Sequence, residues 1–262
     1  MKKKNLQFLC LLLTSVSGYA YDAEIDRIYY NLNTEANTAE VTYSKSKYQG
    51  DVVIPESVTY KDQIYSVCKI GDNAFSGCYR LLSVAIPNSV RNIGNEAFSG
   101  CDSLTSVAIP NSVTKIGHLA FEDCKGLVSI SIPNSVTSIS YGAFRRCSSL
   151  TSVSISRNVA SIGYGTFQYC TALASIIIPN GVTSIGDFAF AGCSALTDVS
   201  LPNRVNTIGS YAFFECSNLA SLTIPNSVKT IGNSAFLRCG GLTVIAIPPS
   251  VISIGTSAFG ST

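Results

Sequence analysis

The sequence has little charge and few of the residues that usually carry chemistry. Among 262 residues only 13% are charged, and there is one His, one Met and no Trp. A disordered chain is excluded, because 46% of the residues are hydrophobic. Without Lys2, Lys3 and Lys4, which we expect to be removed, 15 basic residues face 16 acidic ones. That balance argues against a nucleic-acid partner, because phosphate binding requires a concentrated basic surface.

Long apolar runs are lacking after the N-terminus, so we expect no transmembrane segment. Residues 1–20 have the pattern of a secretory signal peptide: three lysines, a Leu-rich apolar run, and small residues at Gly18 and Ala20. We therefore predict an exported protein, secreted or at the cell surface, whose mature chain begins near Tyr21.

A period of 23 residues runs through most of the sequence. One unit, from Cys101 to Asp123, has the pattern C-x-x-L-x-x-V-x-I-P-N-S-V-x-x-I-G-x-x-A-F-x-x. Leu and Phe recur at the same spacing, without an insertion or deletion. The cysteines show the period most clearly, at Cys78, Cys101, Cys124, Cys147, Cys170, Cys193, Cys216 and Cys239.

The pattern within one unit predicts two short strands and a turn. Val107-x-Ile109 alternates as a strand with one buried face, and Pro110 ends it because proline donates no backbone hydrogen bond. The stretch from Val113 to Gly117 predicts a second extended piece, and Ala120 to Cys124 a helical or 3₁₀ turn. One unit cannot bury both of its faces, so the units must stack around a continuous core. This predicts a solenoid of short parallel strands.

From Ile70 to Phe259 the units resemble the BspA-like, or Treponema-type, leucine-rich repeats, whose pattern C-x-x-L-x-x-I-x-I-P-x-x-V-x-x-I-G-x-x-A-F is matched almost letter for letter. The resemblance implies a curved leucine-rich repeat solenoid with its short parallel strands on one face. It also implies exported or surface-exposed proteins, some of them adhesins that bind host matrix proteins or other microbial cells. Because the matching residues are core positions, the resemblance indicates fold more strongly than function.

We divide the chain into a signal peptide (1–20), an N-terminal β cap (21–67) and a leucine-rich repeat solenoid (68–262) of about eight 23-residue coils. The region 21–67 lacks the period but alternates as three or four strands, and a terminal coil needs a polar cover. A separate small binding domain is the alternative. We expect the C-terminal coil to be uncapped, so that it frays, is covered by a partner, or continues in a longer chain.

The cysteine column admits two interpretations. Neighbouring Cα atoms about 4.8 Å apart would allow disulfides, but stacked side chains point the same way, which opposes a torsion near 90°. We favour a buried column of reduced thiols acting as small hydrophobic groups. Cys68 falls outside the column. We predict no metal site, because a linear column without C-x-x-C cannot converge on a tetrahedral ion.

Nothing in the sequence predicts catalysis or a cofactor. His118, the sole histidine, occupies a variable position, and a Cys-His pair would require Cys124 to leave the core column. There is no glycine-rich phosphate loop and no H-E-x-x-H segment. We therefore expect a non-catalytic protein without a cofactor.

The consensus breaks in one region, where Ser140 replaces Gly, Ser156 replaces Pro and Thr166 replaces Ala. The same coils carry Tyr and Arg, residue types that recognition surfaces use. Alternatively, arginines at 145 and 146 pair with Glu122 and Asp123 one coil earlier, in exposed ion pairs worth about 0–1 kcal/mol each. The candidate binding residues are Tyr141, Arg145, Arg146, Arg157, Tyr164 and Tyr169.

The outward positions of the first strand in each unit are nearly all small, which predicts a smooth face with few of the anchors that dominate binding energy. Two functions fit these features. The first is an adhesin-like scaffold that binds an extracellular protein or glycan through the solenoid surface. The alternative is a structural unit that self-associates end to end through its C-terminal coil.

Overall fold

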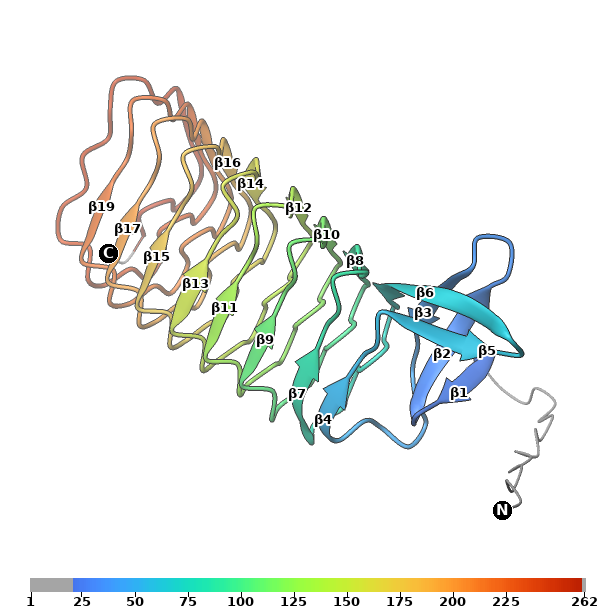
Figure 1. The fold of residues 1–262 in the computed structure, drawn as a ribbon. Coiled ribbons are helices and arrows are strands. Elements are labelled where there is room, and N and C mark those ends of the chain that lie inside the picture. The colour runs from blue at the N-terminus through green and yellow to red at the C-terminus, as the bar shows by residue number, and fades with distance from the viewer. Residues whose placement is uncertain (1–20, 261–262) are drawn as a thin grey trace, which may run out of the picture.

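A computed structural model describes residues 21–260 as a stack of coils with a small antiparallel sheet at its N-terminal end (Figure 1). The expected signal peptide, residues 1–20, lies outside the described residues. The fold class expected from the sequence, a leucine-rich repeat solenoid with an N-terminal β cap, is confirmed, with one correction to the turns that is given below.

The N-terminal end consists of two small antiparallel units. The first is a meander of three strands, β1 (Ala23–Ile25), β2 (Ile28–Asn33) and β3 (Thr38–Val41). The second is a hairpin of β5 (Ser57–Tyr60) and β6 (Gln63–Ile70). Strand β6 pairs in parallel with β3 on one side and with the first short strand of the stack on the other. The meander therefore covers the end of the solenoid through continuous backbone pairing.

The parallel pairing of the solenoid already begins at β4 (Gly50–Val53), which pairs with β7 (Leu81–Ala85). Val52 and Ile54, followed by Pro55, repeat the V-x-I-P pattern of the later coils and are buried. The β5–β6 hairpin then lengthens this coil between its proline corner and Gly71. Residues 50–70 thus form a first coil that carries an inserted hairpin.

Each later coil contributes one strand to a long-strand face and one to a short-strand face, except the last described coil, which has a short strand alone. Partners lie 23 residues apart, as in Ile116 paired with Ile139. The further long strands are β9 (Ser106–Ala108), β11 (Ser129–Ser131), β13 (Ser152–Ser154), β15 (Ser175–Ile177), β17 (Asp198–Ser200) and β19 (Ser221–Thr223). The short strands are β8 (Asn92–Ile93), β10 (Lys115–Ile116), β12 (Ser138–Ile139), β14 (Ser161–Ile162), β16 (Ser184–Ile185), β18 (Thr207–Ile208), β20 (Thr230–Ile231) and β21 (Ser253–Ile254).

The turns that close the coils are not helical, so the predicted helical or 3₁₀ turn is wrong: residues 21–260 contain no helix. The reason lies in the backbone conformation, because Leu119 and Asp123 have φ of 52° and 53°, whereas a helix needs consecutive right-handed residues. The N–H groups of Leu119, Phe121 and Asp123 donate to carbonyls of the next coil at 2.8–2.9 Å. The turns thus form a third ladder between coils.

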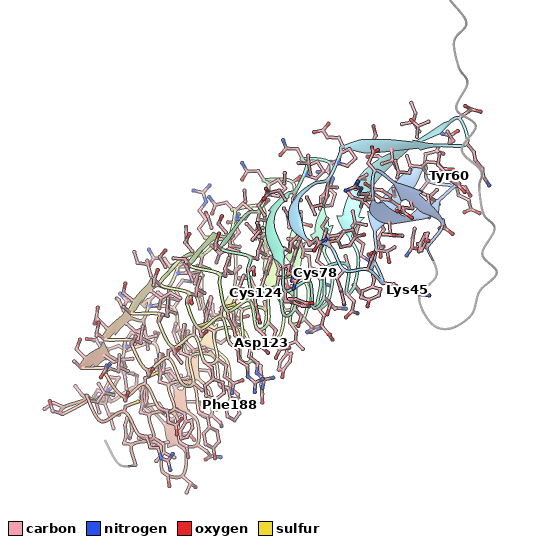
Figure 2. The ribbon with its side chains drawn as sticks, turned by 90° about the horizontal axis from the view of Figure 1, so that it is seen from below. Lys45, Tyr60, Cys78, Asp123, Cys124 and Phe188 are labelled. Atoms are coloured by element: carbon pink, nitrogen blue, oxygen red, sulfur yellow. The ribbon has the colours of Figure 1, made fainter. Side chains whose placement is uncertain are left out.

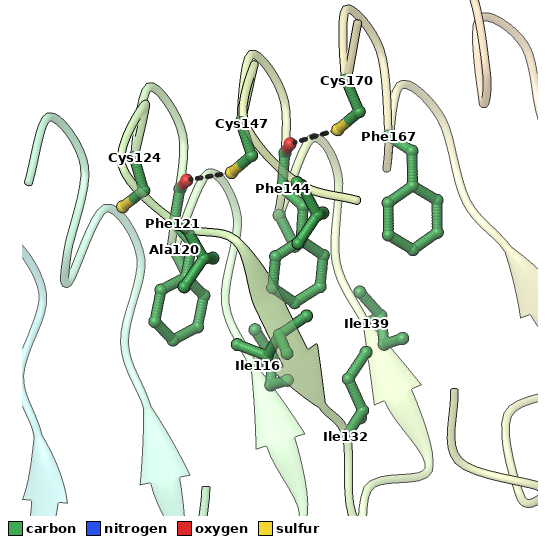
Figure 3. Close-up of a cluster of buried hydrophobic side chains, with 14 of the residues drawn as sticks. Ile116, Ala120, Phe121, Cys124, Ile132, Ile139, Phe144, Cys147, Phe167 and Cys170 are labelled. Carbon is green, nitrogen blue, oxygen red and sulfur yellow. Dashed lines mark hydrogen bonds between the residues drawn. The ribbon is translucent and has the colours of Figure 1, made fainter. Parts of the chain in front are cut away.

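The core is built from columns of identical side chains. Eight consecutive phenylalanine pairs from Phe75 to Phe259 stack with centroids 5.0–5.6 Å apart. Each thiol from Cys101 to Cys239 donates to the carbonyl of a phenylalanine on the preceding coil, as Figure 3 shows for Cys147 and Cys170. All nine cysteines among the described residues are free thiols, which confirms the predicted reduced column.

A glycine column allows the coils to approach closely. A Cβ atom added at Gly117 would lie 2.5 Å from the carbonyl carbon of Gly94, one coil earlier. Such a contact is too short for any side chain, so the period needs glycine here for space. Ser140 is the exception in this column.

Tyr48 closes the N-terminal end of the phenylalanine column. Its ring centroid lies 4.7 Å from that of Phe75. Its hydroxyl donates to the Thr42 carbonyl at 2.8 Å and accepts from the Tyr29 N–H at 3.0 Å. A tyrosine suits this place because one end of the ring is apolar and the other is hydrogen-bonded.

Candidate interaction surface

In four of the described coils the residue after the column glycine stabilises the stack, whereas His118 and Ser210 in the same column make no such link. The side chain of Asn95 accepts a hydrogen bond from the His118 N–H at 2.9 Å, and Asp187 accepts one from the Ser210 N–H at 2.7 Å. Asp72 and Asn233 do the same for the coils that follow them. An Asn or Asp at this position therefore links one coil to the next.

Tyr141 and Tyr164 occupy the same column but form no such link. Among the described residues, the N–H groups of Tyr164 and Asp187, one coil further on, donate no hydrogen bond. The two rings instead contact each other, with centroids 5.1 Å apart and a tilt of 42°. They remain exposed, at 36% and 45%. These tyrosines therefore replace residues that would have stabilised the stack.

The pair belongs to a longer row of aromatic side chains, which we call the outer strip. His118 lies 6.3 Å from Tyr141, and the row continues from Tyr164 through Phe188 and Tyr211. Centroid separations in this second half are 5.3 and 4.8 Å, and a further ring lies 5.7 Å from Tyr211. The outer strip comprises His118, Tyr141, Tyr164, Phe188, Tyr211 and Phe214.

Sequence reasoning missed Phe188, Tyr211 and Phe214. A strict 23-residue register aligns Tyr164 with Asp187, so the ring of Phe188, one residue later, falls outside the column. The sequence does contain a signal for Phe188 and Tyr211, since each aromatic residue lies one position after the column. An alignment of the units that allows a shift of one residue would have found it.

Two residues of the outer strip adopt a backbone conformation that disfavours bulky side chains. Phe188 and Tyr211 each have φ of 56°, at a position where the two preceding coils have Gly142 and Gly165. The left-handed conformation costs a non-glycine residue about 1–2 kcal/mol. The same left-handed conformation occurs at this position in other coils, for example at Glu96 and Leu119, so the turn itself requires it.

The candidate arginines lie on the same turns, in ion pairs between coils. Arg145 is 3.4 Å from Glu122, and Arg146 is 3.7 Å from Asp123. Burial raises the pKa of the Glu122 carboxyl, and the neighbouring Arg145 opposes that shift. The predicted ion pairs are therefore confirmed. Figure 2 shows that Asp123 and Phe188 lie on the same side of the solenoid.

The two remaining candidates lie apart from these pairs. Tyr169 has φ of 60°, and its ring covers Gly192 on the next coil so closely that a Cβ there would overlap it. Arg157 lies in the corner between β13 and β14, where its N–H donates to the Asn134 side chain at 3.0 Å. It is thus at the opposite end of β14 from Tyr164. The structure places five of the six candidate residues on the turns and Arg157 elsewhere.

The long-strand face offers less to a ligand. Its outward side chains are mostly serine and alanine, and Ile177 is an exception at 84% exposure. Two open hollows lie on this face, one beside Ser175 and Asp198 and one beside Ser131 and Ser154. Neither hollow contains an aromatic or arginine side chain.

The described residues do not assemble a catalytic or metal-binding group. The thiol of Cys124 donates to the Phe98 carbonyl at 3.1 Å, and burial raises its pKa, so it is no partner for the exposed His118. Between residues 21 and 260 no cluster of three His, Cys, Asp or Glu side chains could hold a metal ion. Over the same range no helix is long and apolar enough to span a bilayer.

Coils of 23 residues with leucine and phenylalanine columns inside define a leucine-rich repeat solenoid. The family model for the BspA type leucine rich repeat region matches residues 68–177 and 161–262, in six copies. The chain therefore belongs to the BspA-type leucine-rich repeat family, as the sequence indicated. Proteins of this family are in general repeat scaffolds without catalytic activity.

Two solved structures are similar along almost the whole chain. A leucine rich cell surface protein from Faecalibacterium prausnitzii shares 34% identity over 94% of this chain and 75% of its own, with a TM-score of 0.70. A leucine-rich repeat protein from Bacteroides ovatus shares 27% identity over 92% of both chains, with a TM-score of 0.59. Comparison with curated proteins gave no significant match.

Proposed function

We propose that the protein is a non-catalytic scaffold, exported or at the cell surface, that binds an extracellular partner through the outer strip and the arginines beside it. The observation that carries this proposal is the exposed Tyr141–Tyr164 pair, which stands where four other coils keep a stack-stabilising Asn or Asp. A feature that lowers the stability of a repeat stack and is confined to a few coils is better explained by binding than by folding.

Two further features support the location and the role. The N-terminal residues have the pattern of a signal peptide, and the similar protein from Faecalibacterium prausnitzii is described as a cell surface protein. The strip is also long, since its rings run from His118 to Phe214. An elongated surface of this kind suits a macromolecule, in an adhesin-like role.

The chemistry of the strip favours a protein partner. Tyrosine and arginine are the residues most enriched where protein interfaces concentrate their binding energy. Tyr169, Arg145 and Arg146 extend the aromatic strip with the same two residue types. A glycan is the other extracellular ligand expected from the sequence, and the test includes it.

The test is binding of residues 21–262 to an array of extracellular matrix proteins, microbial surface proteins and glycans. A strip variant carries Tyr141→Asn, Tyr164→Asn and Tyr169→Gly, and a matched control carries Ser131→Arg and Ser175→Arg on the long-strand face. We expect binding to a protein that the strip variant loses and the control keeps. The reverse pattern would move the site to the strand face, and no binding at all would contradict the proposed function.

The alternative, end-to-end assembly, is favoured by a different observation. On the last described coil Ile254 is 46% exposed, although its equivalent Ile231 is buried, and the neighbouring apolar side chain of Ile252 is 81% exposed. Apolar surface of this kind often marks an interface. If this coil docks on a second chain, light scattering will show a dimer that Ile252→Lys dissociates, and a concentration-independent monomer would exclude the assembly.

A further inference from the structure

The strand ladders on both faces stop at the same pair of coils. On the short-strand face β12 ends one sheet and β14 begins the next, and on the long-strand face β13 and β15 are likewise unpaired. Where long strands are unpaired elsewhere, as between β7 and β9, the short strands β8 and β10 stay paired. Within the described solenoid, the interface between residues 138–154 and 161–177 is therefore the one with neither strand ladder.

Three backbone hydrogen bonds that the following interface makes are missing here. At that following interface the donors bond across at 2.8–3.0 Å, and they are Thr183, Gly186 and Thr197. In the described structure their equivalents one coil earlier donate no hydrogen bond, namely Ala160, Gly163 and Ala174.

Of the three backbone ladders only the turn ladder crosses this interface, and the Cys170 thiol and Thr171 hydroxyl add bonds to the Phe144 and Ser148 carbonyls at 3.1 and 3.3 Å. The N–H groups of Gly142, Phe144 and Arg146 donate to the next coil at 3.0, 3.0 and 2.7 Å. Tyr141 and Tyr164 contact each other on the same side. The two coils are thus held at the turns and the residues that directly follow them, and no backbone hydrogen bond joins their described strand faces.

Two of the substitutions that break the repeat lie on either side of this gap. Ser140 carries a side chain in the column where Gly117 has no room for a Cβ. The hydrogen bond from the Ser140 N–H to the Ile116 carbonyl is 3.1 Å long, against 2.9 Å for the equivalent bond of Gly117. One coil on, Thr166 fills a buried alanine position, and its hydroxyl donates to the Gly163 carbonyl at 3.0 Å. A Cβ at Gly163 would be 3.6 Å from the nearest backbone atom of the preceding coil, against 2.8 Å at Gly186.

We propose that this interface is a hinge between two rigid ladders, with the turn ladder as its bonded edge. The ladders on either side behave as separate cooperative units, because repeat stacks are coupled only through nearest-neighbour interfaces. Bending opens the two strand faces while the turns stay closed. The hinge does not depend on the function of the outer strip, although the Tyr141–Tyr164 pair spans it.

The test is amide hydrogen exchange measured by NMR on residues 21–262. We expect the amides of Ala160, Gly163 and Ala174 to exchange at least about tenfold faster than those of Thr183, Gly186 and Thr197, because unbonded amides report local opening. Equal protection of the two sets would overturn the hinge, and this comparison needs no variant.

Two variants sharpen the test. Ser140→Gly with Thr166→Ala restores the consensus. We expect this variant to slow exchange of the three unbonded amides, those of Ala160, Gly163 and Ala174, to the rate of the bonded amides one coil later. Gly186→Ser with Ala212→Thr introduces the same two substitutions at an interface that is intact. In the unsubstituted protein the amides of Asn206, Gly209 and Ala220 donate across that interface, and we expect them to exchange faster in the variant. If neither variant changes these rates, the assignment of Ser140 and Thr166 as the cause is wrong.

Discussion

Two rows of aromatic side chains run along the same turns, and they behave differently. The inner row of phenylalanines extends from Phe75 to Phe259 with neighbouring rings nearly parallel, at 1–13°. The outer strip, within three residues of the inner ring in each turn, spans fewer coils, and its first rings are tilted by 40–47°. The inner phenylalanines from Phe75 to Phe236 are fully buried, whereas Tyr141 and Tyr164 are exposed.

The contrast separates what the fold requires from what it only permits. The inner row recurs in every coil because each ring fills the space left by its neighbours. The outer strip instead forfeits backbone hydrogen bonds at Tyr164 and Asp187. Features that stabilise the stack recur in every coil, whereas features that reduce its stability are confined to a few coils.

The largest difference between the two rows is expected when one ring of each is truncated to alanine. Phe144→Ala removes a fully buried ring, and we expect a loss of about 3–5 kcal/mol in the free energy of unfolding. Tyr164→Ala removes an exposed ring, and we expect a change within about 0.5 kcal/mol. Denaturant unfolding measures both. Equal losses would show that the outer strip also belongs to the core.

The glycine column gives the next largest effect. In Gly117→Ala the new Cβ would lie 2.5 Å from the preceding coil, and we expect the overpacking to cost about 1–3 kcal/mol. Gly240→Ala is the matched control, because nothing lies within 4 Å of a Cβ at that position. A tolerated Gly117→Ala, measured by the same unfolding experiment, would contradict the close-approach argument.

Alkaline pH tests the burial of the cysteine column. Burial raises the pKa of the Cys193 thiol to about 12, against about 8.5 in an unfolded chain. The unfolded state therefore loses its proton first, so stability is fully retained below about pH 8.5 and falls as the pH rises toward 12.

Between pH 7 and pH 9.5 we expect the free energy of unfolding of Cys193→Ala to fall by about 1 kcal/mol less than that of the unsubstituted protein. Unfolding midpoints at the two pH values give this difference directly. If the two proteins lose the same unfolding free energy over this pH range, the Cys193 thiol ionises within the folded protein.

Smaller effects are expected from restoring the consensus on the turn surface. Tyr141→Asn gives the column an acceptor for the Tyr164 N–H, as Asn95 provides for His118, and a new hydrogen bond is worth about 0.5–1.5 kcal/mol. We therefore expect unchanged or increased stability. A loss of more than about 1 kcal/mol would make Tyr141 a structural residue.

The smallest effect is expected at Arg146. Its φ of 59° favours glycine, which Gly100 and Gly192 provide in the same column, but glycine would remove the ion pair with Asp123. The strain relieved and the pair lost are each about 1 kcal/mol, so Arg146→Gly should leave the unfolding free energy within about 1 kcal/mol. A larger loss would show that the ion pair supports the stack.

The repeat made the inner columns predictable, because burial at a fixed period leaves the same residue in every unit. The turns were not predictable as non-helical: Leu119 and Asp123 are not glycine, and only their bonds to the next coil show why they adopt left-handed backbone. The second half of the outer strip was missed for a related reason. Phe188 moves one residue out of register, and only the coordinates show that its ring continues the row.

The placement of the candidate residues has a physical basis as well. Tyr141 and Tyr164 could be paired by the 23-residue spacing, since a parallel ladder places such residues side by side. Arg157 could not be assigned to the same surface by spacing alone, because its position within the unit is a corner at the other end of β14.

The central claim is that the outer strip serves binding and not folding. The most direct test is to measure, on the double variant Tyr141→Asn and Tyr164→Asn, both the free energy of unfolding and the dissociation constant for a partner found on the array. The account predicts at least a tenfold weaker complex, about 1.4 kcal/mol, with stability unchanged or raised. Unchanged affinity, or a loss of stability comparable to that of Phe144→Ala, would contradict it.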